Sequence, residues 1–136
     1  MSEDCDYARD LGTEPCDRSM ADPCDACSAQ FYREILASGL GVIARERDEQ
    51  VEDHGYDALH DDQYGQAQLA RAGYLYARAA TDQIRGNKVN LTVAPGNWPW
   101  EPRFWRLDLD RPIHNLAKAG ALIAAEIDRL LRRSDL

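Results

Sequence analysis

Apolar residues recur at helical spacing in three segments of the chain. The first segment is SAQFYREILASGLGVIARERDEQVEDHG, the second QYGQAQLARAGYLYARAATDQIRG, and the third RPIHNLAKAGALIAAEIDRLLRR. Steps of three or four residues place the apolar side chains of each segment on one face of a helix. The three stripes are Tyr32, Leu36, Gly39 and Ile43; Leu69, Gly73, Tyr76, Ala80 and Ile84; and Ile113, Leu116, Gly120, Ile123, Ile127 and Leu130. They predict helices over about 29–53, 63–85 and 111–133, each with its stripe in the core.

Residues that begin or end helices bound these segments. Ser28 is a suitable N-cap for the first helix, and Gly55 a suitable glycine after its end. Asp61 or Asp62 is expected to cap the second helix, which ends at Gly86. In the third, Asp110 is the expected N-cap and Pro112 lies in the first turn. Two glycines in SGLG, residues 38–41, allow the first helix to be in two pieces.

No helical period runs through residues 87–110, which contain all three tryptophans and three of the six prolines. The segment is expected to be a long loop anchored to the helices by buried aromatic rings. Small residues at Ala70, Gly73 and Ala77 would let another helix approach closely. Together these patterns predict an all-α bundle of about three long helices over residues 28–136.

An acidic arm containing every cysteine precedes the helices, at residues 1–27. Cys24 and Cys27 form a C-x2-C pair that leads into the first helix, as in half of a structural zinc site, and Cys5 and Cys16 would complete the ligands. Zinc would order an arm that has too few apolar residues to fold by itself. A mobile tail with reduced thiols, and a disulfide or redox role, are the alternatives.

The net charge of −8 is unevenly distributed. Residues 1–27 and 45–65 each carry −6, and residues 66–136 carry +4. Nucleic-acid binding is not expected, because phosphate neutralisation needs a concentrated basic patch. No segment has the roughly eighteen apolar residues of a membrane span, and the acidic N-terminus lacks the apolar region of a signal peptide. We therefore expect a cytoplasmic protein.

A set of short motifs resembles small proteins encoded by bacteriophages and prophages. Here the motifs are Glu46-Arg47 with Gln50, the HDD of residues 60–62, WPW at 98–100 and KAGALIAAEIDRL at 118–130. The resemblance covers roughly residues 40–131 and implies a phage-type accessory protein. It implies no particular chemistry.

A more distant similarity is to the MazG-like all-α nucleoside triphosphate pyrophosphatases, which bind magnesium through two acidic motifs on successive helices. Glu46-x2-Glu49 matches the first motif, but the second helix has the single acid Asp82. The similarity therefore implies a magnesium site only if other carboxylates replace the second motif. The candidate ligands are Glu46, Glu49, Asp61, Asp62 and Glu126. Acids at the margin of a helical core can form such sites, and capping and ion pairing with arginine are the alternative roles.

These residues lead to several hypotheses for function. The first is a nucleotide-handling protein, enzyme or binder, in which magnesium and His60 meet the phosphates and Trp98, Trp100 or Trp105 stacks on the base. The second is an interaction module that binds a host protein, with DNA mimicry as a variant. The third is a structural homo-oligomer built on the last helix.

Overall fold

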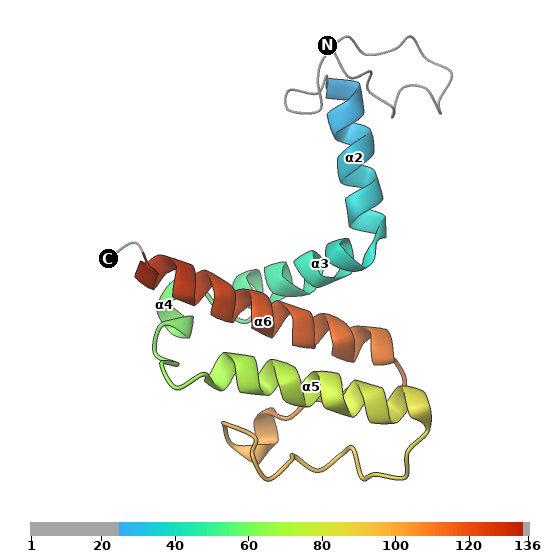
Figure 1. The fold of residues 1–136 in the computed structure, drawn as a ribbon, viewed down its shortest axis with the longest axis vertical. Helices are drawn as coiled ribbons and strands as arrows, with labels where there is room; N and C mark the ends of the chain where they lie inside the picture. Colours follow the sequence, from blue (N-terminus) through green and yellow to red (C-terminus); the bar gives the residue numbers. More distant parts are fainter. Residues whose placement is uncertain (1–24, 135–136) are drawn as a thin grey trace. The chain divides into compact units, whose positions relative to one another are not determined.

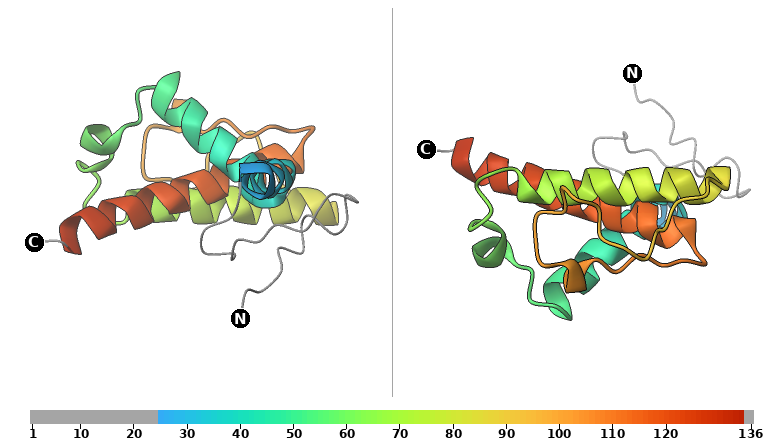
Figure 2. Two further views of the ribbon diagram at one scale, coloured as in Figure 1. Left: turned by 90° about the horizontal axis from the view of Figure 1, so that it is seen from above. Right: turned by 90° about the horizontal axis from the view of Figure 1, so that it is seen from below.

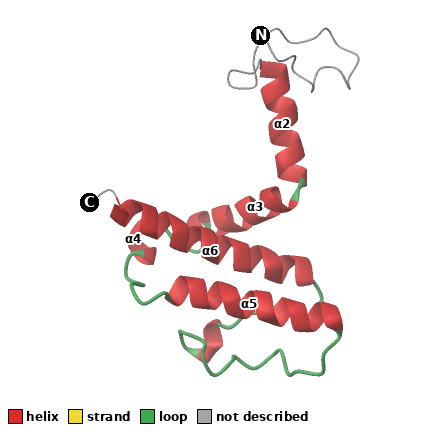
Figure 3. Cartoon of the chain, in the orientation of Figure 1, coloured by secondary structure: helices red, strands yellow, loops and turns green. Residues whose placement is uncertain are grey.

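The computed structural model describes residues 25–134, and every element in this range is helical (Figures 1 and 3). The elements are α2 (Asp25–Ala37), α3 (Gly39–Glu52), α4 (Ala58–Asp61), α5 (Gln68–Arg85), the 3₁₀ helix η1 (Pro102–Phe104) and α6 (Pro112–Ser134). The predicted all-α class is therefore confirmed for this range. Within it, no helix combines the length and apolarity needed to cross a bilayer. The proposed zinc ligands Cys5, Cys16 and Cys24 lie outside the described residues, and only the backbone of Cys27 is described, in α2.

The chain divides into two compact units, residues 1–42 and 43–136. In the first unit, the expected break in the first helix occurs at Ser38, between α2 and α3. The Ser38 backbone N–H donates to the Ile35 carbonyl at 3.0 Å. A side chain at Gly41 would collide with the backbone of Ile35 and Leu36, so only glycine fits this bend.

The second unit is built on α5 and α6, which lie side by side and run antiparallel (Figures 1 and 2). A Cβ added to Gly73 would lie 3.0 Å from the Ala119 carbonyl oxygen, so the two backbones approach closely. This bears out the expectation that the small residues of α5 admit a neighbouring helix. Tyr76, Trp105 and Ala119 form the centre of the core with Leu75 and Ala79.

The prediction that the stripe of α6 forms the core is wrong. Its isoleucine and leucine side chains are 42–69% exposed: Ile113, Leu116, Ile123, Ile127 and Leu130. The buried residues of α6 are small or polar: Asn115, Ala117, Ala119, Ala121, Ala125, Glu126 and Arg129. Helical spacing in the sequence shows that a helix has an apolar face. It does not show whether that face packs against the rest of the protein. Alanine occupies four of these buried positions, and the α5 backbone comes closest to α6 at one of them, Ala119.

Several predicted caps are also placed differently, and Ser28 lies within α2, which begins at Asp25. Asp61 and Asp62 end α4 and do not cap α5, which begins at Gln68 after Ala67 in the left-handed conformation. Ahead of α6, Asp108 Oδ1 accepts from the backbone N–H groups of Asp110 and Arg111, both at 3.1 Å, and so fixes the turn that leads into the helix. Gly86 ends α5 with φ +68°, as expected.

Candidate functional site

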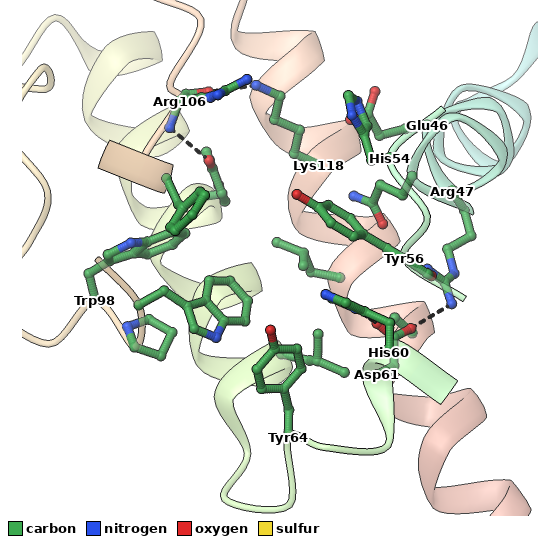
Figure 4. Close-up of a pocket in the computed structure, with 18 of the residues that line it drawn as sticks. Glu46, Arg47, His54, Tyr56, His60, Asp61, Tyr64, Trp98, Arg106 and Lys118 are labelled. Atoms are coloured by element: carbon green, nitrogen blue, oxygen red, sulfur yellow. Dashed lines mark hydrogen bonds and ion pairs between the residues drawn. The ribbon is translucent and has the colours of Figure 1, made fainter. Parts of the chain in front are cut away.

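A pocket of about 800 Å³ opens within the second unit (Figure 4). It is lined from α3, from α4 and its flanking turns, from α5, from residues 98–106 and from α6. Seen from below, α3, α4 and the segment between α5 and α6 all lie on one side of the α5–α6 pair (Figure 2, right). The volume lies within the range of about 300–1,000 Å³ that small-molecule sites occupy.

The α3 wall of the pocket is fixed to α4 by an ion pair. Arg47 Nη2 lies 2.9 Å from Asp61 Oδ2, and Arg47 Nη1 donates to the Tyr56 carbonyl at 3.1 Å. The second oxygen of Asp61 lies 3.1 Å from His60 Nδ1. Asp61 is buried, and each of its carboxylate oxygens has a partner within the protein. These contacts join the Glu46-Arg47 motif of α3 to the HDD motif of residues 60–62.

Aromatic rings form a continuous wall along one side of the pocket. His60 stacks on Tyr56 at 4.7 Å between ring centroids and meets the edge of Tyr64 at 5.3 Å. Tyr64 in turn lies 5.2 Å from Trp100, which lies 5.2 Å from Trp98. We call these five residues the aromatic wall. Planar rings in a partly apolar pocket are suited to stacking against a planar ligand.

The three tryptophans predicted to bind a ligand have different environments. Trp105 is buried in the core, stacks on Tyr76 and donates from Nε1 to the Leu91 carbonyl at 3.0 Å. It therefore does not line the pocket. Trp98 donates to the Glu101 carbonyl at 3.2 Å. The Trp100 Nε1 atom is buried and has no hydrogen-bond partner. Trp98 and Trp100 remain candidate ligand contacts.

Two cations lie next to each other at another end of the pocket, which we call the cationic end (Figure 4). Lys118 Nζ donates to the Arg106 carbonyl at 2.5 Å. Neither side chain forms an ion pair within residues 25–134. Burial lowers the pKa of Lys118, and the positive charge of Arg106 lowers it further, while Glu46 and Asp108 oppose the shift. The cationic end would be stabilised by an anion.

Glu46 faces the same end and is linked to a histidine. His114 lies between two carboxylates, with Nε2 3.3 Å from Glu46 Oε2 and Nδ1 3.0 Å from Asp108 Oδ2. Asp108 Oδ2 also accepts from Arg111 Nε at 2.8 Å. The hydrogen bond from His114 is the main cause that holds the pKa of Asp108 well below its usual value. His114 is thereby oriented with one nitrogen towards the pocket residue Glu46.

The five predicted magnesium ligands do not form one cluster. Asp62 pairs with Arg132 at 2.7 Å, and Glu126 pairs with Arg129 at 2.8 Å. Glu49 is exposed, and only Glu46 and Asp61 line the pocket. Among the described residues, no group of three or more His, Cys, Asp or Glu side chains is arranged to hold a metal ion. Most of these acids neutralise arginines.

The motifs that carry the resemblance converge on the pocket more completely than the acids do. Its lining includes residues from every one of them: Glu46, Arg47, Gln50, His60, Asp61, Trp98, Pro99, Trp100, Lys118, Leu122 and Ala125. Sequence reasoning missed the roles of Lys118, Arg106, Tyr56 and Tyr64. A signal was present for the tyrosines, because Tyr56, His60 and Tyr64 are spaced by four residues. Lys118 is one of only two lysines in the chain.

Comparisons with protein-family models, with curated proteins and with solved structures find no match to this chain.

Proposed function

We propose that the pocket binds an anionic ligand that carries a planar ring, and that this ligand is a nucleotide. The observation that carries the proposal is the pair of adjacent cations, Lys118 and Arg106, without carboxylate partners in the described chain, in one pocket with an aromatic wall. Phosphate would neutralise the cations and a base would stack on the rings. A pocket of about 800 Å³ has room for both parts.

In this proposal, magnesium binds together with the phosphate groups of the nucleotide. Magnesium is commonly held by one or two carboxylates together with substrate phosphates, so a complete protein cage is unnecessary. Glu46 is the predicted ligand best suited to this role, because it lines the pocket near the cationic end. Asp61 also lines the pocket, but both of its oxygens are engaged by Arg47 and His60.

Thermal unfolding with a ligand panel tests the proposal. ATP, AMP, adenosine and inorganic pyrophosphate are compared, each with magnesium and with EDTA. We expect ATP to raise the melting temperature most, because it offers both the ring and several negative charges, and adenosine to raise it least. If ATP and pyrophosphate raised the melting temperature equally, the aromatic wall would have no role in binding the ligand. No response to any nucleotide would contradict the proposal.

Lysine substitution supplies the matched control. Lys118→Gln removes a charge from the pocket, whereas Lys88→Gln removes one from an exposed position outside its lining. We expect the ATP-induced shift to fall strongly in the first variant and to persist in the second. Equal shifts in the two variants would show that the contribution of charge is not local to the pocket.

A further inference from the structure

Two aromatic side chains that line the pocket stay exposed, and they belong to different segments of the chain. Tyr56 is 38% exposed and lies in the turn between α3 and α4. Phe104 is 43% exposed and is the last residue of η1. An exposed aromatic ring in a pocket offers a surface on which a planar ligand can stack. The pocket therefore has two such surfaces.

The first surface is a group of three rings, which we call the tyrosine platform. Tyr56 lies 4.7 Å from His60 between ring centroids, with the two rings inclined by 22°. It lies 5.6 Å from His54, with an inclination of 31°. All three rings line the pocket, and Arg47 holds the platform to α3 through its hydrogen bond to the Tyr56 carbonyl. A nucleobase would extend this group by one more ring.

The second surface consists of Phe104 and Trp98, which we call the phenylalanine platform. The Glu101 carbonyl accepts from the Phe104 backbone N–H at 3.0 Å and from Trp98 Nε1 at 3.2 Å, so these two residues are held close together. The Arg103 guanidinium lies 4.7 Å from the centroid of the Phe104 ring. Within residues 25–134, no other aromatic ring contacts that of Phe104. This ring is therefore available to a ligand.

The two platforms lie on opposite sides of the pocket (Figure 4). In that view Trp98 lies on the left and Tyr56 on the right, with open space between them. The cationic end, Lys118 and Arg106, lies at the top of the view. A ligand with a single base covers only one platform, whereas a ligand with two bases covers both.

The size of the pocket agrees with a ligand that has two bases. At the packing density of a protein interior, a mononucleotide of about thirty non-hydrogen atoms occupies roughly 500 Å³, and a dinucleotide of about 45 such atoms roughly 750 Å³. The pocket has a volume of about 800 Å³. A dinucleotide therefore fills the pocket, whereas a mononucleotide leaves a large part of it to water.

We propose that the ligand consists of two nucleosides joined through phosphate, an inference that rests on the proposed nucleotide function. One base stacks on the tyrosine platform and the other on the phenylalanine platform. The linking phosphate groups bind at the cationic end, where Lys118 and Arg106 neutralise them. Because both bases belong to one molecule, binding of the first raises the effective concentration of the second. The affinity should therefore exceed that of a nucleotide with one base.

Calorimetric titration of the full chain with four ligands tests the inference. ATP is compared with the linear dinucleotide pApA, cyclic diadenylate and diadenosine tetraphosphate. We expect at least one two-base ligand to bind, as one molecule per chain, at least tenfold more tightly than ATP. A second stacked base should contribute roughly 5- to 150-fold. The tightest of the three identifies how the two nucleosides are joined.

Substitution of one ring in each platform shows whether both platforms bind a base. Tyr56→Leu and Phe104→Leu should each lower the affinity for the two-base ligand at least fivefold, whereas only one of them should lower the affinity for ATP. Both side chains are partly exposed, so the variants should fold, as circular dichroism will check. Tyr74→Leu is the matched control, because Tyr74 is 54% exposed and lies outside the pocket lining. It should bind every ligand as the unmodified chain does.

Two results would overturn this inference and leave the proposed function intact. If ATP binds and none of the two-base ligands binds more tightly, the pocket has one base position. If both Tyr56→Leu and Phe104→Leu lower the affinity for ATP, the two platforms enclose a single base. Binding of none of the four ligands would contradict the proposed function as well.

Discussion

The guanidinium of Arg47 and the buried carboxylate of Asp61 form a partly buried ion pair, 2.9 Å between Nη2 and Oδ2, that joins α3 to α4 in the pocket wall. Fourteen residues separate the two partners. Because His60 binds the other oxygen of Asp61, the pair also orients the first ring of the aromatic wall. The contact therefore shapes the pocket as well as stabilising the unit.

Asp61→Asn should destabilise the protein by about 3 kcal/mol, because it leaves the mostly buried charge of Arg47 without a counter-ion. Asp62→Asn is the matched control, since Asp62 is half exposed and its ion pair with Arg132 is near the surface. It should change the free energy of unfolding by less than about 1 kcal/mol. Urea unfolding of both variants measures the difference. Equal effects would show that burial of the Arg47 pair is unimportant.

Gly73→Ala should destabilise the α5–α6 packing by about 1–3 kcal/mol, because the added methyl meets the Ala119 carbonyl oxygen at 3.0 Å. Alanine favours a helix over glycine by about 1 kcal/mol, so the clash must exceed that gain. Gly96→Ala is the control, since a Cβ there meets nothing within 4 Å. A Gly73→Ala variant more stable than the unmodified protein would contradict the close approach of these helices.

Asp108 should make stability depend on pH in the acidic range. Its folded pKa lies below the ordinary value of 3.8, so its contribution to the free energy of unfolding is present above that value and is lost as the pH falls towards the folded pKa. The difference in stability between the unmodified protein and Asp108→Asn should be largest above about pH 5 and shrink below about pH 4. Chemical unfolding at a series of pH values measures it. If the difference in the free energy of unfolding between the two proteins stayed constant over this pH range, ionisation of Asp108 would not be linked to folding.

Lys118 predicts a pH dependence of ligand binding at the alkaline end. Since its pKa is lowered, it loses its charge at a lower pH than an ordinary lysine, and affinity for an anionic ligand should fall there. Lys118→Arg keeps the charge, because arginine stays protonated in proteins, and should flatten this part of the profile. Titrations of ATP between about pH 7 and 10 test the effect. If the affinity for ATP falls with pH in the same way in both proteins, the charge of Lys118 does not contribute to binding of the anionic ligand.

The sequence predicted the helices better than it predicted their faces. The break at Ser38 and the end of α5 at Gly86 follow from local chemistry, glycine above all, and both were foreseen. Which residues of a helix are buried depends on long-range packing, and the periodicity of the sequence carries no information about that packing. Asn115 illustrates this: it is fully buried because its side-chain amide donates to Gln83 Oε1 and the Asp108 carbonyl and accepts from the Asp108 N–H.

The candidate site was predicted only in part, for an electrostatic reason. Glu46, His60, Asp61, Trp98 and Trp100 do line the pocket. Asp62 and Glu126 instead pair with arginines of α6, and the spacing of carboxylates alone gives no indication of such partners. The cationic end was missed because Arg106 and Lys118, twelve residues apart, meet only when the segment before α6 folds back on that helix.

Isothermal titration calorimetry with ATP, AMP and adenosine tests the central claim most directly. The account predicts saturable binding of ATP to the unmodified protein and to Lys88→Gln, with affinity decreasing from ATP to AMP to adenosine. It predicts at least a tenfold weaker affinity of ATP for Lys118→Gln, provided that this variant keeps the helical spectrum of the unmodified protein. Undetectable binding of ATP, with and without magnesium, or equal affinity in the two lysine variants, would contradict the claim that this pocket is a nucleotide site.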